Sequence, residues 1–181
     1  MNNAWSQENY IKACLFAANA HQGQRVPGTE LPYLVHLSMV SLEVLAALPA
    51  DRALDANLAV QCAWLHDTIE DTQTTYFQIE QAFGVKVADG VLALSKDAAV
   101  EKPLQMTDSL RRIRLQPREV WLVKLADRIT NLQPPPAHWT KEKAAVYREQ
   151  AIEICDALGE ASELLSARLR SNAEAYKQFT A

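Results

Sequence analysis

Glycine is scarce in this sequence, and the pattern typical of β-strands is missing. Only 5 of the 181 residues are glycine, and no long stretch alternates apolar and polar residues with a period of two. The segments with a clear period repeat apolar residues every three or four positions, as amphipathic helices do. The composition, 49% hydrophobic and 22% charged, suits a single domain over residues 1–181 with a buried core. We therefore predict an all-α fold, a single helical bundle of about eight helices.

Cysteine is also sparse, and long apolar runs are absent. Cys14, Cys62 and Cys155 are too far apart to form a CxxC metal or redox motif, so we expect reduced thiols in a cytoplasmic protein. The N-terminal residues do not combine a basic segment with an apolar one, as a signal peptide would. No apolar run approaches the ~18 residues that span a bilayer. We expect no membrane partner.

An excess of positive charge is missing as well. The formal net charge is −4 at pH 7, whereas proteins that bind a nucleic-acid backbone usually carry a clustered basic excess. We therefore expect no nucleic-acid partner. A local basic pocket for a small anionic molecule remains compatible with this total. The sequence does not indicate an oligomeric state.

Capping signals mark several helix boundaries. Ser6 has the side chain of an N-cap, and Thr75 with Gln78 fits a capping box. Gly84 is a natural residue just beyond a helix end, and Pro117 suits a position near a helix start. We also expect a helix that runs from about Leu54 to Ile69, a loop over residues 97–107, and two closing helices near 140–158 and 160–178.

One short segment concentrates histidine and acidic residues. The segment AWLHDTIED, residues 63–71, places His66, Asp67, Glu70 and Asp71 directly after an apolar run. Charged groups at the end of a buried helix are costly unless something pairs with them. Residues three and four apart share a helix face, so these side chains converge. Imidazole nitrogen and carboxylate oxygen are ligands for a divalent metal, which would supply the missing positive charge.

Two further polar residues lie in apolar surroundings. His36 shares a helix face with Val40, and a histidine in such a position, taken alone, is more often a hydrogen-bonded core residue than a metal ligand. Asp127 follows a mostly apolar run, and aspartate is rarely buried without a partner. Lys124, three residues earlier, offers such a partner. Lys124, Asp127 and Asn131 also form a stripe, as a polar seam facing a site would.

Several motifs together resemble a known family. In chain order they are FAANAHQGQR, PYLVH, AWLHDTIEDTQTT, FGVKVADGV and VKLADRITNL, followed by Trp139, Tyr147 and Ala151. The pattern resembles the HD-domain metal-dependent phosphohydrolases. It resembles most the hydrolase domain of RelA/SpoT-type proteins and the stand-alone small alarmone hydrolases. The resemblance covers roughly residues 10–160.

The resemblance implies a reaction and a set of residues. Such enzymes use Mn²⁺ to remove the 3′-pyrophosphate from (p)ppGpp, which gives GDP or GTP and pyrophosphate. By motif position, one ion would be held by His36, His66, Asp67 and Asp127. Glu70 and Asp71 match the acidic pair that activates and orients the attacking water. No synthetase-like segment follows the motifs, so we expect a hydrolase without an opposing activity on the same chain.

The resemblance also suggests contacts with a nucleotide. Asn131 matches an asparagine that faces the sugar. The basic residues that would offset the phosphate charge are Arg25, Lys96, Arg128 and Lys143. Taken alone, Lys96 and Lys143 are equally solvated surface lysines. Val26 stands where relatives have an arginine that packs on guanine, and valine can neither stack a cation on a purine nor donate a hydrogen bond. The adenine analogue (p)ppApp is therefore a second candidate substrate.

Two other functions remain open at this point. The same metal centre could remove a monophosphate from another nucleotide such as NADPH, and orthophosphate rather than pyrophosphate would then be released. Alternatively, the protein could bind a nucleotide without turnover. The intact pair of Glu70 and Asp71 speaks against such a sensor.

Overall fold

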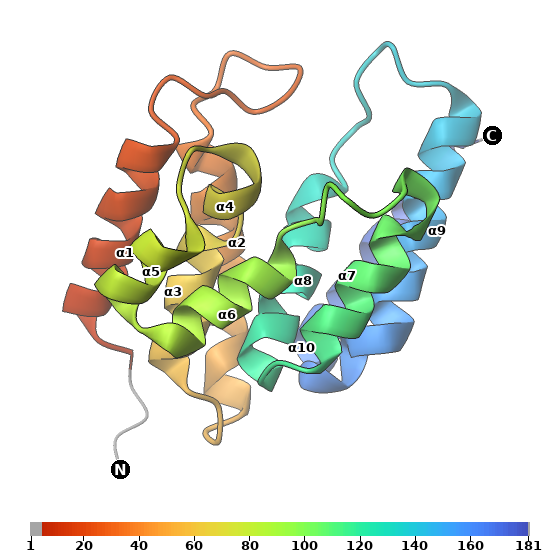
Figure 1. Ribbon diagram of the computed structural model, residues 1–181. Coiled ribbons are helices and arrows are strands. Elements are labelled where there is room, and N and C mark those ends of the chain that lie inside the picture. The colour runs from red at the N-terminus through yellow and green to blue at the C-terminus, as the bar shows by residue number, and fades with distance from the viewer. Residues whose placement is uncertain (1–4, 181) are drawn as a thin grey trace.

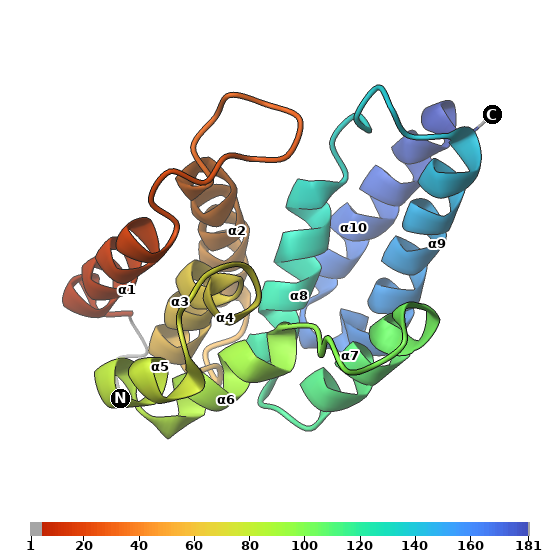
Figure 2. The same cartoon turned by 45° about the horizontal axis from the view of Figure 1, so that its top comes forward.

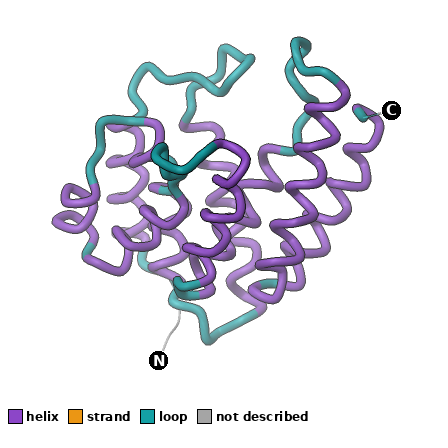
Figure 3. The backbone as a smooth tube through the Cα atoms, turned by 45° about the vertical axis from the view of Figure 1, so that its right-hand side comes forward, coloured by secondary structure: helices purple, strands orange, loops and turns teal. Residues whose placement is uncertain are grey.

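The computed structural model describes residues 5–180, and helices dominate this range (Figure 3). The α-helices are α1 (Gln7–Ala20), α2 (Leu34–Ala47), α3 (Ala56–Leu65), α4 (Thr68–Asp71), α5 (Tyr76–Phe83), α6 (Val85–Leu94), α7 (Gln105–Arg114), α8 (Arg118–Asn131), α9 (Lys141–Leu158) and α10 (Glu163–Ala175). Short 3₁₀ helices cover Leu48–Ala50, Lys102–Leu104, Gly159–Ala161 and Tyr176–Phe179. Between residues 5 and 180 the only β-type pairing is an isolated bridge from Arg25 to Pro32. The prediction of an all-α fold is confirmed.

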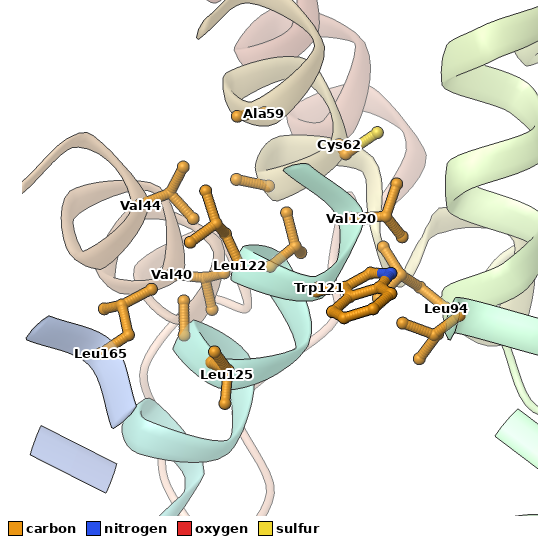
Figure 4. Close-up of a cluster of buried hydrophobic side chains, with 14 of the residues drawn as sticks. Val40, Val44, Ala59, Cys62, Leu94, Val120, Trp121, Leu122, Leu125 and Leu165 are labelled. Atoms are coloured by element: carbon orange, nitrogen blue, oxygen red, sulfur yellow. The ribbon is translucent and has the colours of Figure 1, made fainter. Parts of the chain in front are cut away.

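Helix α8 forms the centre of the bundle. It packs against α2 and α3 on one side and against α9 and α10 on the other (Figures 1 and 2). Every residue of α8 from Glu119 to Thr130 is buried. Figure 4 shows Leu122 and Leu125 of α8 among apolar side chains of α2 and α10. Because α8 is buried on all sides, each polar residue that it carries needs a partner inside the protein.

The capping signals in the sequence are confirmed. The Ser6 hydroxyl accepts the Asn9 N–H at 3.2 Å, and both bonds of the capping box between Thr75 and Gln78 are present. Gly84 ends α5 with a φ of 88°, a conformation that glycine adopts without strain. Pro117 lies directly before α8. These boundaries follow from local hydrogen bonding, and this is why the sequence reveals them.

Two predicted boundaries are wrong. The helix expected over 54–69 ends at Leu65, and His66 and Asp67 form a turn before the single turn of α4. The Thr68 hydroxyl donates to the Leu65 carbonyl at 2.6 Å and closes this turn. Residues 97–107 are not wholly a loop, because a 3₁₀ helix and the start of α7 lie within them. Apolar spacing shows neither change, because neither the Thr68 hydrogen bond nor a 3₁₀ helix of three residues produces an apolar repeat.

The two long loops near residues 21–33 and 132–140 project at the same end of the molecule (Figures 1 and 3). The C-terminal end of α8 and the N-terminal end of α2 lie beneath them (Figure 2). The three cysteines are free thiols. Among residues 5–180, no helix has the length and apolarity that crossing a membrane requires.

Candidate metal centre and active site

Two histidines and two aspartates from separate elements meet beneath the loops. His36 comes from α2, His66 and Asp67 from the turn after α3, and Asp127 from α8. Asp67 Oδ2 lies 2.9 Å from His66 Nε2 and 3.4 Å from His36 Nε2. Asp127 Oδ1 lies 3.6 Å from His36 Nε2 and 3.8 Å from His66 Nε2. Four potential ligand atoms therefore face one small volume.

The hydrogen bonds of the two imidazoles indicate which ring nitrogens are free. His66 Nδ1 lies 2.9 Å from the Ala63 carbonyl, which can only accept, so Nδ1 carries the hydrogen. His36 Nδ1 has a longer contact of 3.5 Å with Thr130 Oγ1, whose own hydrogen goes to the Asp127 carbonyl. The Nε2 lone pairs of both rings then face each other at 3.3 Å. Two unprotonated Nε2 atoms at this distance repel each other unless a proton or a metal cation lies between them.

The charge distribution agrees with a cation site. Burial alone would lower the pKa of His66, but Asp67 and Asp127 raise it to about 9. The pKa of Asp67 is low despite burial, chiefly because of His66 and His36. The raised pKa of His66 indicates a negative potential at its ring, to which the carboxylates of Asp67 and Asp127 contribute. Two imidazole nitrogens and two carboxylate oxygens make a donor set that fits a divalent first-row metal ion.

Neighbours on α8 hold Asp127 in place. Lys124 Nζ lies 3.2 Å from Asp127 Oδ2, and Asn131 Nδ2 donates to Asp127 Oδ1 at 2.5 Å. The ion pair that the sequence offered as the alternative explanation of Asp127 is thus present. This ion pair is compatible with metal binding, because Lys124 contacts Oδ2 of Asp127 whereas Oδ1 faces the histidines. Both neighbours fix the orientation of the Asp127 carboxylate, as residues that support metal ligands do.

The turn of α4 carries Glu70 and Asp71 to the rim of the site. Both line a cavity of about 190 Å³ together with His66, Asp67 and Asp127. Glu70 accepts the Lys96 backbone N–H at 2.8 Å and the Lys96 ammonium at 2.5 Å. Burial and the nearby Asp67 and Glu70 charges raise the pKa of Asp71 above its usual value. A carboxylate with a raised pKa is suited to accept a proton.

Tyr33 is a site residue that the sequence analysis missed. Its hydroxyl donates to Asp67 Oδ2 at 2.6 Å and to Asp71 Oδ2 at 3.2 Å. Burial, and after it the charge of Asp67, raises the pKa of Tyr33, so the hydroxyl keeps its proton and donates. His21 stacks on the ring at 4.8 Å between centroids. The available signal was the position of Tyr33, three residues before His36, where a side chain can face the same site.

The predicted nucleotide contacts are not all brought together. Lys96 and Asn131 line the same cavity as three of the potential ligands, His66, Asp67 and Asp127. Arg25 pairs with Glu30 and lines an adjacent cavity of about 350 Å³, which meets the first at Tyr33. Two others lie elsewhere and instead pack on aromatic rings. Arg128 is only 6% exposed and lies 4.1 Å from the Tyr147 ring centre, and Lys143 lies 4.3 Å from that of Trp139.

A comparison with known protein families shows to which of them this chain belongs. Residues 13–156 match the family described as HD domain. The chain belongs to the HD-domain family. The match spans α2, α3, α4 and α8, so it includes every element that supplies a potential ligand of the HD domain.

Relatives of this HD domain include proteins named as pyrophosphohydrolases. The guanosine-3′,5′-bis(diphosphate) 3′-pyrophosphohydrolase MESH1 of Xenopus tropicalis is 30% identical over 164 residues, which cover 88% of this chain and 89% of that protein. Human MESH1 is 31% identical over 160 residues, or 82% and 83% of the two chains. A GTP pyrophosphokinase of Myxococcus xanthus is 36% identical over 152 residues, but these cover only 19% of that protein.

A solved structure has the same fold as this HD domain. It is that of a metazoan orthologue of SpoT, described as hydrolysing ppGpp and acting in starvation responses. The two structures superpose with a TM-score of 0.79 at 25% identity, over 93% of this chain and 96% of the other. The chain is thus an HD-domain protein of the RelA/SpoT type, similar in length and fold to the small alarmone hydrolases.

Proposed function

We propose that this protein is a metal-dependent hydrolase that removes the 3′-pyrophosphate from guanosine 3′,5′-bis(diphosphate) and its close analogues. The observation that carries the proposal is the convergence of two imidazole Nε2 atoms, 3.3 Å apart, with Asp67 and Asp127 beside two further carboxylates. The MESH1 relatives, which match nearly the whole chain, bear the name of this activity. The products would be GDP or GTP and pyrophosphate.

We assign His36, His66, Asp67 and Asp127 as ligands of a single divalent ion, Mn²⁺. When bound, such an ion lowers the pKa of its water and offsets negative charge on a phosphate. Ala63 and Thr130 orient the two imidazoles, and Lys124 and Asn131 orient Asp127. The choice of Mn²⁺ rests on the resemblance to the family, because the donor set itself suits several divalent metals.

We assign Glu70 and Asp71, the acidic pair on α4, to the activation and orientation of the attacking water. Glu70 and Asp71 line the same cavity as the ligands, so either carboxylate can accept a hydrogen bond from a water held there. The raised pKa of Asp71 suits this carboxylate to accept the proton. Glu70, held by Lys96 through both oxygens, orients the water. As the water oxygen forms its bond to the phosphorus next to the sugar, the water proton passes to Asp71. The bond from that phosphorus to the 3′ oxygen breaks, and the nucleotide leaves through this oxygen, which takes up a proton, while the pyrophosphate is released.

A whole nucleotide needs more room than the ligand cavity provides. That cavity is about 190 Å³, but it adjoins the cavity beside Arg25 and a third of about 670 Å³, which it meets at Glu70 and Lys96. Ligand sites commonly occupy 300–1,000 Å³. We expect Lys96 to contact the phosphates and Asn131 to contact the sugar. Arg25 can reach the substrate if it leaves Glu30, and Arg128 and Lys143 remain predictions.

We propose the purine preference from one difference from the family, the valine at position 26 in place of an arginine. Val26 offers no side-chain donor to a purine edge, so we expect (p)ppApp to be accepted along with (p)ppGpp. Discrimination between purines depends on buried donors and acceptors that one base satisfies and the other does not. A site without the guanine-facing arginine therefore loses part of that discrimination. We further propose a cytoplasmic location, which the three unpaired cysteines support.

The deciding experiment is a turnover assay of the purified protein with Mn²⁺. ppGpp, ppApp and NADPH are supplied in parallel, and pyrophosphate and orthophosphate are both quantified. Pyrophosphate from either alarmone supports the proposal, and the rate ratio reports the effect of Val26. Orthophosphate from NADPH alone would replace it with the phosphatase alternative. Tight nucleotide binding without any product would replace it with the sensor.

A further inference from the structure

Arg112, which lies on α7 outside the ligand cluster, caps the end of α6. Its Nη1 donates to the Leu92 and Ala93 carbonyls at 2.9 and 3.1 Å, and its Nη2 donates to the Ser95 carbonyl at 2.9 Å. The last carbonyls of a helix have no partner within the helix and carry partial negative charge. A guanidinium presents its donors in a rigid planar fork, so it can satisfy several of these carbonyls at once.

The guanidinium of Arg112 is itself held from the other side. Its Nε donates to Asp108 Oδ2 at 2.7 Å, while Arg111 uses Oδ1 of the same carboxylate at 2.7 Å. The two arginines differ in what else they touch. The Arg112 side chain is 22% exposed and binds α6, whereas the Arg111 side chain is 65% exposed and pairs with Asp108. Arg111 is therefore a natural control for Arg112.

One peptide group connects Arg112 to Glu70. The Ser95 carbonyl that accepts from Arg112 and the Lys96 N–H that donates to Glu70 Oε2 belong to the same peptide bond. This unit is planar and trans, so its carbonyl and N–H point in opposite directions and rotate together. The orientation that Arg112 imposes on the carbonyl is therefore passed to the N–H. Hydrogen bonds in such a chain also polarise one another.

Glu70 depends on its two hydrogen bonds to Lys96 because a cavity lies beside its carboxylate. Glu70, Lys96 and Arg112 line the same cavity of about 670 Å³. Lys96 holds both Glu70 oxygens, one by its backbone and one by its side chain, and the lysine side chain is 52% exposed. If the Ser95–Lys96 peptide turns, both bonds to Glu70 are disturbed and the carboxylate can swing into the cavity.

We propose that Arg112 is a positioning residue that sets the orientation of Glu70 through the Ser95–Lys96 peptide. The proposal rests on the function assigned to Glu70 above, but its structural part does not. Arg112 touches none of the four residues assigned as metal ligands. Its replacement should therefore alter turnover and the Lys96 amide while leaving metal binding intact.

The test compares R112Q with R111Q and with the wild type. Amide hydrogen exchange, followed by NMR, should show the Lys96 N–H exchanging about tenfold faster in R112Q and unchanged in R111Q. We expect kcat for pyrophosphate release to fall about 10- to 100-fold in R112Q with a smaller change in KM. The Mn²⁺-induced shift in melting temperature, measured without nucleotide, should stay at the wild-type value.

A double-mutant cycle separates positioning from general destabilisation. If Arg112 acts through Glu70, R112Q should lower kcat no further when E70Q is already present. Independent, multiplicative losses would overturn the proposal, as would an unchanged Lys96 exchange rate in R112Q. If R112Q does not fold, R112K, which keeps the charge but not the planar fork, takes its place in both measurements. If the wild type hydrolyses no nucleotide, the proposed function fails, and the exchange rate alone decides whether Arg112 holds the peptide and Glu70.

Discussion

The Tyr33 hydroxyl bridges Asp67 and Asp71, at 2.6 and 3.2 Å from one oxygen of each. A single side chain from the start of α2 thus links an assigned metal ligand to an assigned proton acceptor on α4. The bond to Asp67 is made to Oδ2, the same oxygen that faces the two histidines. The relative positions of ligand and base therefore depend on one phenolic donor.

Removing that donor should weaken the site without unfolding the protein. We expect Tyr33→Phe to bind Mn²⁺ about 10- to 100-fold more weakly, because residues that support metal ligands contribute on this scale. Isothermal titration with Mn²⁺ in the absence of nucleotide measures the change. Tyr76→Phe is the matched control, since Tyr76 also donates to a carboxylate, Asp89 at 2.8 Å, on α6. Equal affinities in the two variants would show that Tyr33 has no role in holding Asp67.

Asp127→Ala should abolish metal binding and turnover together. The variant loses one ligand, and it leaves Lys124, only 9% exposed, without its carboxylate partner. Breaking a buried ion pair by removing one member costs about 3–5 kcal/mol, so the melting temperature should fall as well. Asp127→Asn, which keeps the shape of the side chain, controls for the lost packing. Metal content by elemental analysis and turnover by pyrophosphate release check the prediction; full activity would remove Asp127 from the ligand set.

Glu70→Gln should separate metal binding from catalysis. The amide keeps the shape of the carboxylate and can still accept from the Lys96 N–H, but it loses the negative charge that orients the water. We expect kcat to fall on the order of 10²-fold, the loss that a misplaced reacting group causes, with Mn²⁺ content unchanged. Kinetics and metal analysis are run on the same preparation. A parallel loss of metal would make Glu70 a ligand instead.

Metal binding should release a proton. In the metal-free protein Asp67 and Asp127 raise the pKa of His66 to about 9, against an ordinary value of 6.5, so the ring is protonated at neutral pH. A ligating imidazole must be neutral, so the ion displaces this proton, and affinity should rise about tenfold per pH unit up to about pH 9. Calorimetry in two buffers of different ionisation enthalpy measures the number of protons released. Identical heats in both buffers would contradict the prediction.

The same shift predicts how the metal-free protein responds to pH. The pKa of His66 is raised on folding, so its protonation stabilises the folded state fully below about pH 6.5, and this contribution is lost as the pH rises to about 9. The melting temperature of metal-free protein should therefore fall over this window. With Mn²⁺ at saturation the histidine is already neutral, and this part of the pH dependence should disappear.

The sequence by itself determined the features that depend on near neighbours in the chain. The caps at Ser6 and Thr75 follow from hydrogen bonds within one helical turn, and the all-α fold follows from apolar spacing. The polar residues that have no place in a buried helix, His66 and Asp127, marked the site because burying them requires partners. Resemblance to a family then supplied the roles that spacing could not.

Only the tertiary structure decided which distant residues meet. The helix breaks at His66 and Asp67 because these side chains turn toward α2 and α8. The spacing of apolar residues in the sequence does not reveal this requirement. Tyr33 contacts Asp67, which lies 34 residues later in the chain, and Arg112 contacts Ser95, which lies 17 residues earlier. Arg128, one residue after a ligand candidate, points away to Tyr147, because successive side chains on a helix face different directions. Such contacts depend on how helices pack, and packing is a property of the whole chain.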